Sequence, residues 1–328
     1  MRPGPLATAP GWKLKDYVWP VIGGAAVALS VWLLVHELRS LSLNDVLESL
    51  QAIPPHRWLL AAASTFLAYA ALAGYDRMAL LHLQKAVSWP FVVLCSFTAY
   101  ALAHNIGASV LSGAVVRYRA YSTRGLAAAE VGVLVALCSF TFALGTVMLS
   151  GIVLLLQPDL PSRFVDDVPH GLSLALGGLA LAAVALYVLG SWMHFPPLSI
   201  RGFQLHYPRL PIVCRQLLLG PLELVGAAGI LYFALPVTAN PGFVVVLGLF
   251  LASFSVALLS HAPGGLGVLE LLFITGLPEL DPADVLAALI VFRLFYLLLP
   301  FAASIVVVLL FERSEFTRQR PEVSQEPE

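Results

Sequence analysis

Long apolar runs recur along almost the whole chain. With a window of about 20 residues, the length that crosses the hydrocarbon core of a bilayer, they lie at 18–35, 58–81, 88–107, 127–156, 171–193, 211–235, 242–261 and 284–311. Hydrophobic residues occupy 59% of the 328 positions and charged residues 11%, against about 45–50% and about 25% in soluble domains. Because a helix satisfies its own backbone hydrogen bonds in lipid, the predicted fold class is an all-α polytopic membrane protein.

Charge and cysteine content exclude several classes of function. The formal net charge is -1, and no basic run with interleaved aromatic residues suggests a nucleic-acid partner. Cys95, Cys138 and Cys214 lie in apolar stretches without CxxC spacing, which argues against a disulfide framework or a zinc site. No metal motif or nucleotide-binding loop is present. We therefore expect no cofactor and no metal, and membrane phospholipid is the partner that this composition favours.

Two apolar runs are interrupted by small residues and proline. One contains "ALAHNIGASVLSGAVVR" at 101–117, and the other contains "SHAPGGLGVLELL" at 260–272. Non-helical backbone at membrane depth is tolerated only where protein or a water-filled cavity satisfies it. We therefore expect helix-break turns that line a cavity, formed by Gly107, Gly113, Pro263, Gly264, Gly265 and Gly267.

The charged loops indicate how these interrupted runs cross the membrane. If 88–116 and 242–277 are re-entrant hairpins, Lys85, the arginines of 117–124 and the tail after 311 share one side, while the acidic segments 157–170 and 278–284 share the other. The positive-inside rule makes the first side cytoplasmic. The prediction is about six full spans and two broken helical hairpins, with both termini in the cytoplasm.

This layout predicts three regions of the chain. Residues 1–17 form a cytoplasmic N-terminal segment, 18–311 form a single transmembrane domain, and 312–328 form a disordered cytoplasmic tail. Within the transmembrane domain, 58–156 and 211–311 both read span, hairpin, span, as expected of inverted repeats. Segments interrupted by Gly or Pro at corresponding places in two such halves indicate a transporter substrate site.

Polar residues in or beside the apolar runs are candidates for a lipid-headgroup site, because a buried charge costs roughly 2.5–3.5 kcal/mol at the bilayer centre. Glu223 and Arg293 are the deepest, about ten residues from the nearest span end. An arginine can bind a phosphate through two hydrogen bonds. The full candidate set is Asp76, Asn105, Arg117, Arg119, Glu223, Glu270 and Arg293.

Most of these candidates also have a purely structural interpretation. Asp76 could form an interfacial pair with Arg77, and Arg117 and Arg119 could be charges that set the topology. Asn105 could satisfy backbone groups freed at the first break, and Glu270 could lie in a solvated loop.

At these residues the chain resembles a known family. The segments "GYDRMALLHL", "NIGASVLSGAVVRYRAYSTRGL", "PLELVG" and above all "HAPGGLGVLE" are similar to the transmembrane region of lysylphosphatidylglycerol synthases, over about 18–311. In multiple peptide resistance factors of this family, such a region is implicated in moving aminoacylated phospholipid to the outer leaflet, and a separate cytoplasmic domain makes that lipid. The synthetase domain has no counterpart in this sequence. By motif match the resemblance carries over Asp76, Arg117, Glu223 and Glu270, whereas Arg293 is added from its depth alone.

The resemblance implies a lipid transporter of the flippase type in the inner membrane of a bacterium, acting on an anionic or aminoacylated phospholipid and not an enzyme. Two alternatives remain open. The first is an accessory or scaffold subunit of a separate lipid- or glycan-modifying enzyme. The second is an intramembrane serine hydrolase that pairs Ser109 with His261, although the motif around Ser109 is short.

Overall fold

The computed structural model describes residues 43–106, 109–193, 198–200, 203–205, 208–260 and 267–318. Within them it is a helical bundle with five helices long and apolar enough to cross a membrane. They are α3 (Pro55–His82), α6 (Ala128–Leu156), α7 (His170–Trp192), α8 (Leu210–Ala234) and a continuous helix made of α11 (Pro282–Phe292), η3 (Arg293–Leu298) and α12 (Leu299–Arg318). The polytopic all-α class is confirmed, and the span expected at 18–35 lies outside the described residues.

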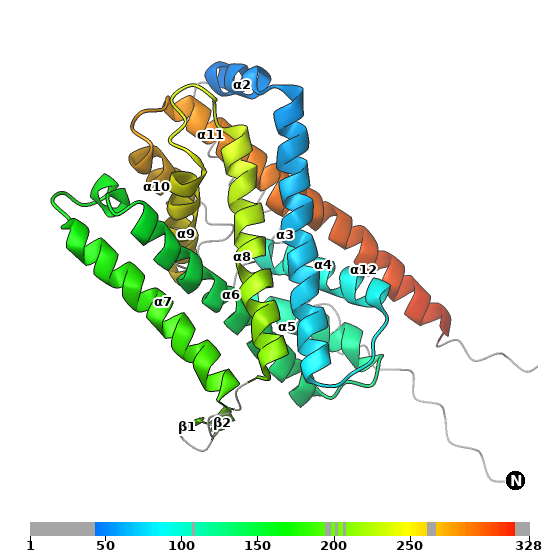
Figure 1. The fold of residues 1–328 in the computed structure, drawn as a ribbon. Coiled ribbons are helices and arrows are strands. Elements are labelled where there is room, and N and C mark those ends of the chain that lie inside the picture. Colours follow the sequence, from blue (N-terminus) through cyan, green and yellow to red (C-terminus); the bar gives the residue numbers. More distant parts are fainter. Residues whose placement is uncertain are drawn as a thin grey trace, which may run out of the picture.

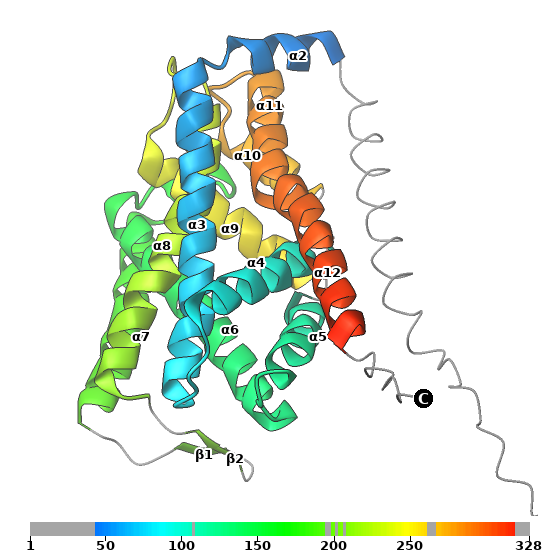
Figure 2. The same cartoon turned by 90° about the vertical axis from the view of Figure 1, so that its right-hand side faces the viewer.

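The first interrupted run forms a helical hairpin that returns to the end where it began. It consists of α4 (Trp89–Ile106) and α5 (Ser109–Ser122), which pack against each other. Lys85, just before α4, forms an ion pair of 2.8 Å with Glu130, in the first turn of α6. Entry and exit are thus joined at the lower end of the molecule in Figure 2, as the re-entrant prediction requires.

The second interrupted run forms a hairpin that opens at the opposite end. Helices α9 (Phe243–Ser260) and α10 (Val268–Gly276) descend from the upper end and return to it (Figures 1 and 2). Arg163, in the short 3₁₀ turn η1 (Leu160–Arg163), donates to the Gly276 carbonyl at 2.6 Å and pairs with Glu279 at 2.9 Å. The two acidic loops therefore lie together, as predicted from their charge.

The order span, hairpin, span occurs twice, with the hairpins opening in opposite directions. In the first case it is α3, α4–α5 and α6; in the second it is α8, α9–α10 and α11–α12. This is the arrangement expected of an inverted repeat. The boundaries of the two halves, 58–156 and 211–311, and the division into tails and membrane domain stay predictions.

Helix α8 lies at the centre of the bundle and is packed on several sides, as expected of a helix that is apolar all round. Small residues let its neighbours approach closely. A Cβ added to Gly145 of α6 would lie 2.6 Å from the backbone of Gly220, and one added to Gly226 would lie 2.8 Å from the Ala68 backbone nitrogen of α3. These glycines fix the distances between α8 and the helices that carry the site.

Two peripheral elements complete the fold. Helix α2 (Leu43–Ala52) lies across the upper end and packs on α11. Strands β1 (Leu198–Ile200) and β2 (Phe203–Leu205) form a small antiparallel pair between α7 and α8, with Leu198 opposite Leu205. The apolar runs did not predict these strands, because they lie in a connection outside the membrane spans.

Candidate functional site

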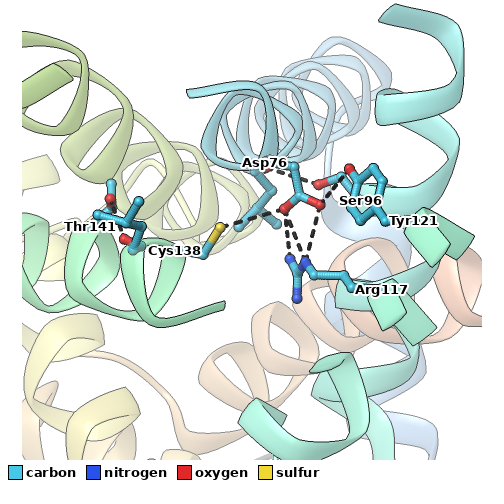
Figure 3. Close-up of polar contacts among 8 residues, drawn as sticks. Asp76, Ser96, Arg117, Tyr121, Cys138 and Thr141 are labelled. Atoms are coloured by element: carbon cyan, nitrogen blue, oxygen red, sulfur yellow. Dashed lines mark hydrogen bonds and ion pairs between the residues drawn. The ribbon is translucent and has the colours of Figure 1, made fainter. Parts of the chain in front are cut away.

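A buried ion pair joins α3 to the first hairpin (Figure 3). The Arg117 guanidinium donates from Nη2 to Asp76 Oδ1 at 2.9 Å and from Nε to both carboxylate oxygens at 3.1 Å. The Tyr121 hydroxyl donates to Asp76 Oδ2 at 3.0 Å, and the Cys138 thiol lies 3.6 Å from Oδ1. Asp76 has no solvent exposure and Arg117 only 4%, so this is an ion pair inside the protein rather than the interfacial pair with Arg77.

The Arg117 side chain is held between a glycine that leaves room for it and an aromatic ring. Gly113 lies one turn earlier on α5, and a Cβ there would come within 3.0 Å of Arg117 Nη1. The prediction of a helix-break turn at Gly113 is therefore wrong, because this glycine lies inside α5 and makes room for the guanidinium. On its other side Arg117 stands 4.4 Å over the Tyr100 ring of α4, a favourable cation–π contact.

A second buried ion pair joins the second hairpin to the long final helix. Glu270 of α10 pairs with Arg293, the first residue of η3, and both side chains are nearly inaccessible to solvent. Gly267 has φ of +78°, which favours glycine, and its N–H donates to Glu270 Oε2 at 2.7 Å. Gly267 therefore lies in the break directly before α10, as predicted, whereas Gly107, Pro263, Gly264 and Gly265 lie outside the described residues.

The segment that carries Arg293 is a π-turn, η3, in an otherwise α-helical span. Such turns displace backbone carbonyls from the regular ladder and are frequent at functional sites. The Tyr69 hydroxyl donates to the Tyr296 carbonyl at 2.9 Å, and Asn105 Nδ2 donates to the Leu297 carbonyl at 3.2 Å. Asn105 thus satisfies backbone in η3 and ties α4 to that turn.

Glu223 lies in the middle of α8 and contacts η3, the turn that also carries Arg293. It is 1% exposed and accepts a hydrogen bond of 2.5 Å from the Tyr296 hydroxyl to Oε1. Its second oxygen has no hydrogen-bond partner among the residues that the structure describes. Tyr75 of α3 interacts electrostatically with the same carboxylate.

An aromatic file connects the sites and was not predicted. The His104 ring stacks on Tyr296 with centroids 5.1 Å apart and lies 5.9 Å from the Tyr100 ring, which in turn contacts Arg117. The file therefore runs from the first ion pair to the hydrogen-bond donor of Glu223. The available signal was the presence of Tyr and His within apolar runs, since a buried tyrosine usually finds a partner for its hydroxyl.

The structure thus places six of the seven candidates in one connected interior region. Asp76 and Arg117, Glu270 and Arg293 form pairs, while Glu223 and Asn105 contact η3. Arg119 is exposed on α5 and lies outside this region. Within the described parts of the chain, no three His, Cys, Asp or Glu side chains come together as a group that could hold a metal ion.

Residues 21–304 match the family described as the lysylphosphatidylglycerol synthase TM region. The chain belongs to this family. Similar proteins include the uncharacterized protein slr0712 of Synechocystis, 28% identical over 95% of this chain and 97% of that protein. Another is the inner membrane protein YbhN of Escherichia coli, 27% identical over 92% of this chain and 94% of that protein. The match to the family covers α2 to α11, η3 and the start of α12, and so includes both hairpins and both buried ion pairs.

Proposed function

We propose that this member of the family is a lipid transporter that moves a phospholipid with an anionic headgroup between the two leaflets of a bacterial inner membrane. The observation that carries the proposal is the pair of buried arginines. Arg117 and Arg293 belong to elements built around the two broken hairpins, and each is held by a carboxylate at membrane depth. Intramembrane ionisable residues mark substrate pathways by default, and the family match and the relative YbhN, which is named an inner membrane protein, support this location.

The two hairpins suggest a route for the headgroup. One opens at each end of the molecule, and α4 of the first packs against α12. Arg117 lies on the first hairpin and Arg293 pairs with Glu270 of the second, so the interior region joins the two hairpins. In the proposed mechanism the lipid tails stay in the hydrocarbon while the headgroup passes through this region.

Each ion pair contains an arginine that can bind a phosphate in place of its carboxylate. A guanidinium binds carboxylate and phosphate with the same forked geometry. In the lipid-free protein Asp76 and Glu270 therefore pair with the arginines, and the phosphate of an arriving lipid replaces one of these carboxylates. This exchange keeps each guanidinium paired, and the carboxylate that it releases must be hydrated or protonated, because an unpaired charge in a desolvated site costs several kcal/mol.

The test is a pair of neutralising double variants in proteoliposomes. Glu270→Gln with Arg293→Gln removes the buried pair without leaving one charge alone, and should abolish movement of a fluorescent phosphatidylglycerol between leaflets. Arg163→Gln with Glu279→Gln removes an ion pair of the same type that is about 30% exposed, and should retain the wild-type rate. The readout is the fraction of probe that a membrane-impermeant reductant quenches over time.

Thermal unfolding in detergent confirms that each double variant is folded. Wild-type translocation by Glu270→Gln with Arg293→Gln, or the absence of lipid movement by the unmodified protein with every anionic lipid tried, contradicts the proposed function. In the second case, co-purification with a lipid-modifying enzyme would favour an accessory role.

A further inference from the structure

The buried charges of the interior region do not balance. Among the described residues, the buried acidic side chains are Asp76, Glu223 and Glu270, and the buried basic ones are Arg117 and Arg293. The two buried ion pairs use two of the acids and both arginines, which leaves Glu223 as the buried acid without a basic partner among the described residues. An ionised carboxylate without a counter-charge at this depth is strongly unfavourable, and binding a proton removes the charge.

The surroundings of Glu223 suit a carboxyl group that gains and loses a proton. Tyr296 donates to Oε1, while Oε2 and the Tyr75 hydroxyl both have no hydrogen-bond partner among the described residues. The unpartnered oxygen provides a place for the proton and the Tyr75 hydroxyl a nearby acceptor. The neighbours are oxygen and aromatic groups that could not neutralise a permanent negative charge.

Other titratable groups near α8 are already engaged or distant. Helix α3 contributes Tyr69, which donates to the Tyr296 carbonyl, and α4 contributes His104 behind the Tyr296 ring. On α6, Cys138 points to Asp76; on α7, Tyr187 donates to Gln216; on α11, Asp284 lies in the first turn. Helix α9 carries no titratable side chain in Phe243–Ser260. The proton is therefore assigned to Glu223.

We propose that Glu223 binds a proton that is carried together with the anionic lipid, so that translocation is driven by a proton gradient. The inference rests on the proposed function and deepens it by naming the coupling ion. In the step itself, an O–H bond of a hydronium ion breaks as an O–H bond to the Glu223 carboxylate forms, and on the other side of the membrane that bond breaks and water takes the proton. A neutral Glu223 repels an arriving phosphate less than an ionised one, so proton and lipid favour each other's binding.

The π-turn provides the mechanical link between the two ligands. Arg293 and Tyr296 lie three residues apart in η3, so the group that meets the lipid phosphate and the group that donates to Glu223 belong to one turn of helix. A shift of η3 when Arg293 exchanges Glu270 for phosphate also moves the Tyr296 hydroxyl. Lipid binding can thus change the affinity of Glu223 for its proton without direct contact.

Proton binding is tested without lipid transport by infrared difference spectroscopy on the purified full-length protein during a pH titration. We expect a protonated-carboxyl band that is present in the wild type and in the partly exposed control Glu279→Gln, and absent in Glu223→Gln. Tyr296→Phe keeps the ring stack with His104 and removes the hydroxyl, so the band should persist with a shifted midpoint. A band unchanged in Glu223→Gln overturns the assignment.

Coupling is tested by the leaflet distribution of fluorescent phosphatidylglycerol in proteoliposomes with an imposed pH gradient. If one proton accompanies each lipid, the probe accumulates in the leaflet facing the alkaline side by about tenfold for each pH unit. A protonophore should abolish the accumulation. Equal distribution despite rapid movement shows passive transport and overturns the coupling alone, and accumulation that follows a sodium gradient but ignores pH overturns the choice of ion. Absence of any movement instead removes the proposed function, while the infrared result stands.

Discussion

Asp76 and Arg117 form an ion pair that solvent barely reaches, with three guanidinium hydrogen bonds and a tyrosine hydroxyl on one carboxylate. Buried pairs of this kind contribute little compared with a well-packed apolar pair, but removing one partner leaves the other charge uncompensated. The pair therefore makes the packing of α3, α5 and α6 depend on a single side chain.

At this scale we predict that Asp76→Asn lowers the free energy of unfolding by about 3–5 kcal/mol, because Arg117 keeps its charge in a desolvated site. The measurement is thermal or denaturant unfolding in detergent. Glu279→Gln, which breaks an ion pair on a partly exposed surface, is the matched control and should cost less than about 1 kcal/mol.

The double change Asp76→Leu with Arg117→Met should recover part of the stability, since it removes both charges. Additive losses from the two changes would show that the contact between Asp76 and Arg117 does not determine the stability of this region.

At the scale of helices, close approach between α6 and α8 depends on two facing glycines. A Cβ on Gly220 would lie 2.7 Å from the Thr141 carbonyl oxygen, and one on Gly145 would lie within 3 Å of the Gly220 backbone. Backbone cannot give way as a flexible side chain can, so the helices must separate to admit a methyl group. Separation would also shift Cys138 and Gln216, which lie on these helices near the site.

We predict that Gly145→Ala destabilises the protein by about 1–3 kcal/mol, the usual range for overpacking. Gly132→Ala, on the same helix, meets nothing within 4 Å and should be neutral or slightly stabilising, because alanine favours a helix over glycine. Comparing the two unfolding temperatures checks the prediction. Equal effects would mean that helix propensity, rather than the crossing of α6 and α8, decides the outcome.

The elements were more predictable than the contacts between them. Apolar length located α3 and α6 to within a few residues, since 58–81 and 127–156 became Pro55–His82 and Ala128–Leu156. Which charged side chains pair depends on how each helix is rotated about its axis. Side-chain packing determines this rotation, and hydropathy carries no information about it. The sequence therefore identified Arg117 as a candidate but could not assign Asp76 as its partner, and it placed Gly113 in a turn.

The contacts of Glu270 and Tyr296 were likewise not predictable from the sequence. The sequence marked Glu270 by its motif and Arg293 by its depth, but it did not show which carboxylate pairs with the arginine. The packing of α10 against the final helix makes Glu270 the partner. Tyr296 received no prediction, because its role arises from a π-turn that no residue pattern announced.

At the scale of the whole molecule, contacts at the two ends settle which loops share a side. Lys85 and Glu130 join the connections around the first hairpin, while Arg163 and Glu279 join the two acidic loops at the other end. From the positive-inside rule we expect the first group to face the cytoplasm.

We predict that single cysteines placed at 165–167 react with an impermeant thiol reagent added outside the cell, whereas those at 122–124 react only after the membrane is permeabilised. Cys214→Ser is the starting background, because Cys214 is exposed while Cys95 and Cys138 are buried. Reaction of both sets from outside would contradict the arrangement of two opposed hairpins.

The π-turn at 293–298 also has a consequence for how the chain tolerates insertions and deletions. A π-turn holds one residue more than the α-helical turn it replaces, so deleting one residue within 294–298 could restore a regular helix without disturbing the hydrophobic length of the span. Because the turn absorbs that extra residue, the helical parts before and after the deletion would keep their register, and Arg293 would still face Glu270. The side chains within the turn would move instead, so the Tyr296 hydroxyl would no longer donate to Glu223. A single codon in this segment thus separates a Glu223 that has its donor from one that has lost it, in a span whose hydropathy would hardly change.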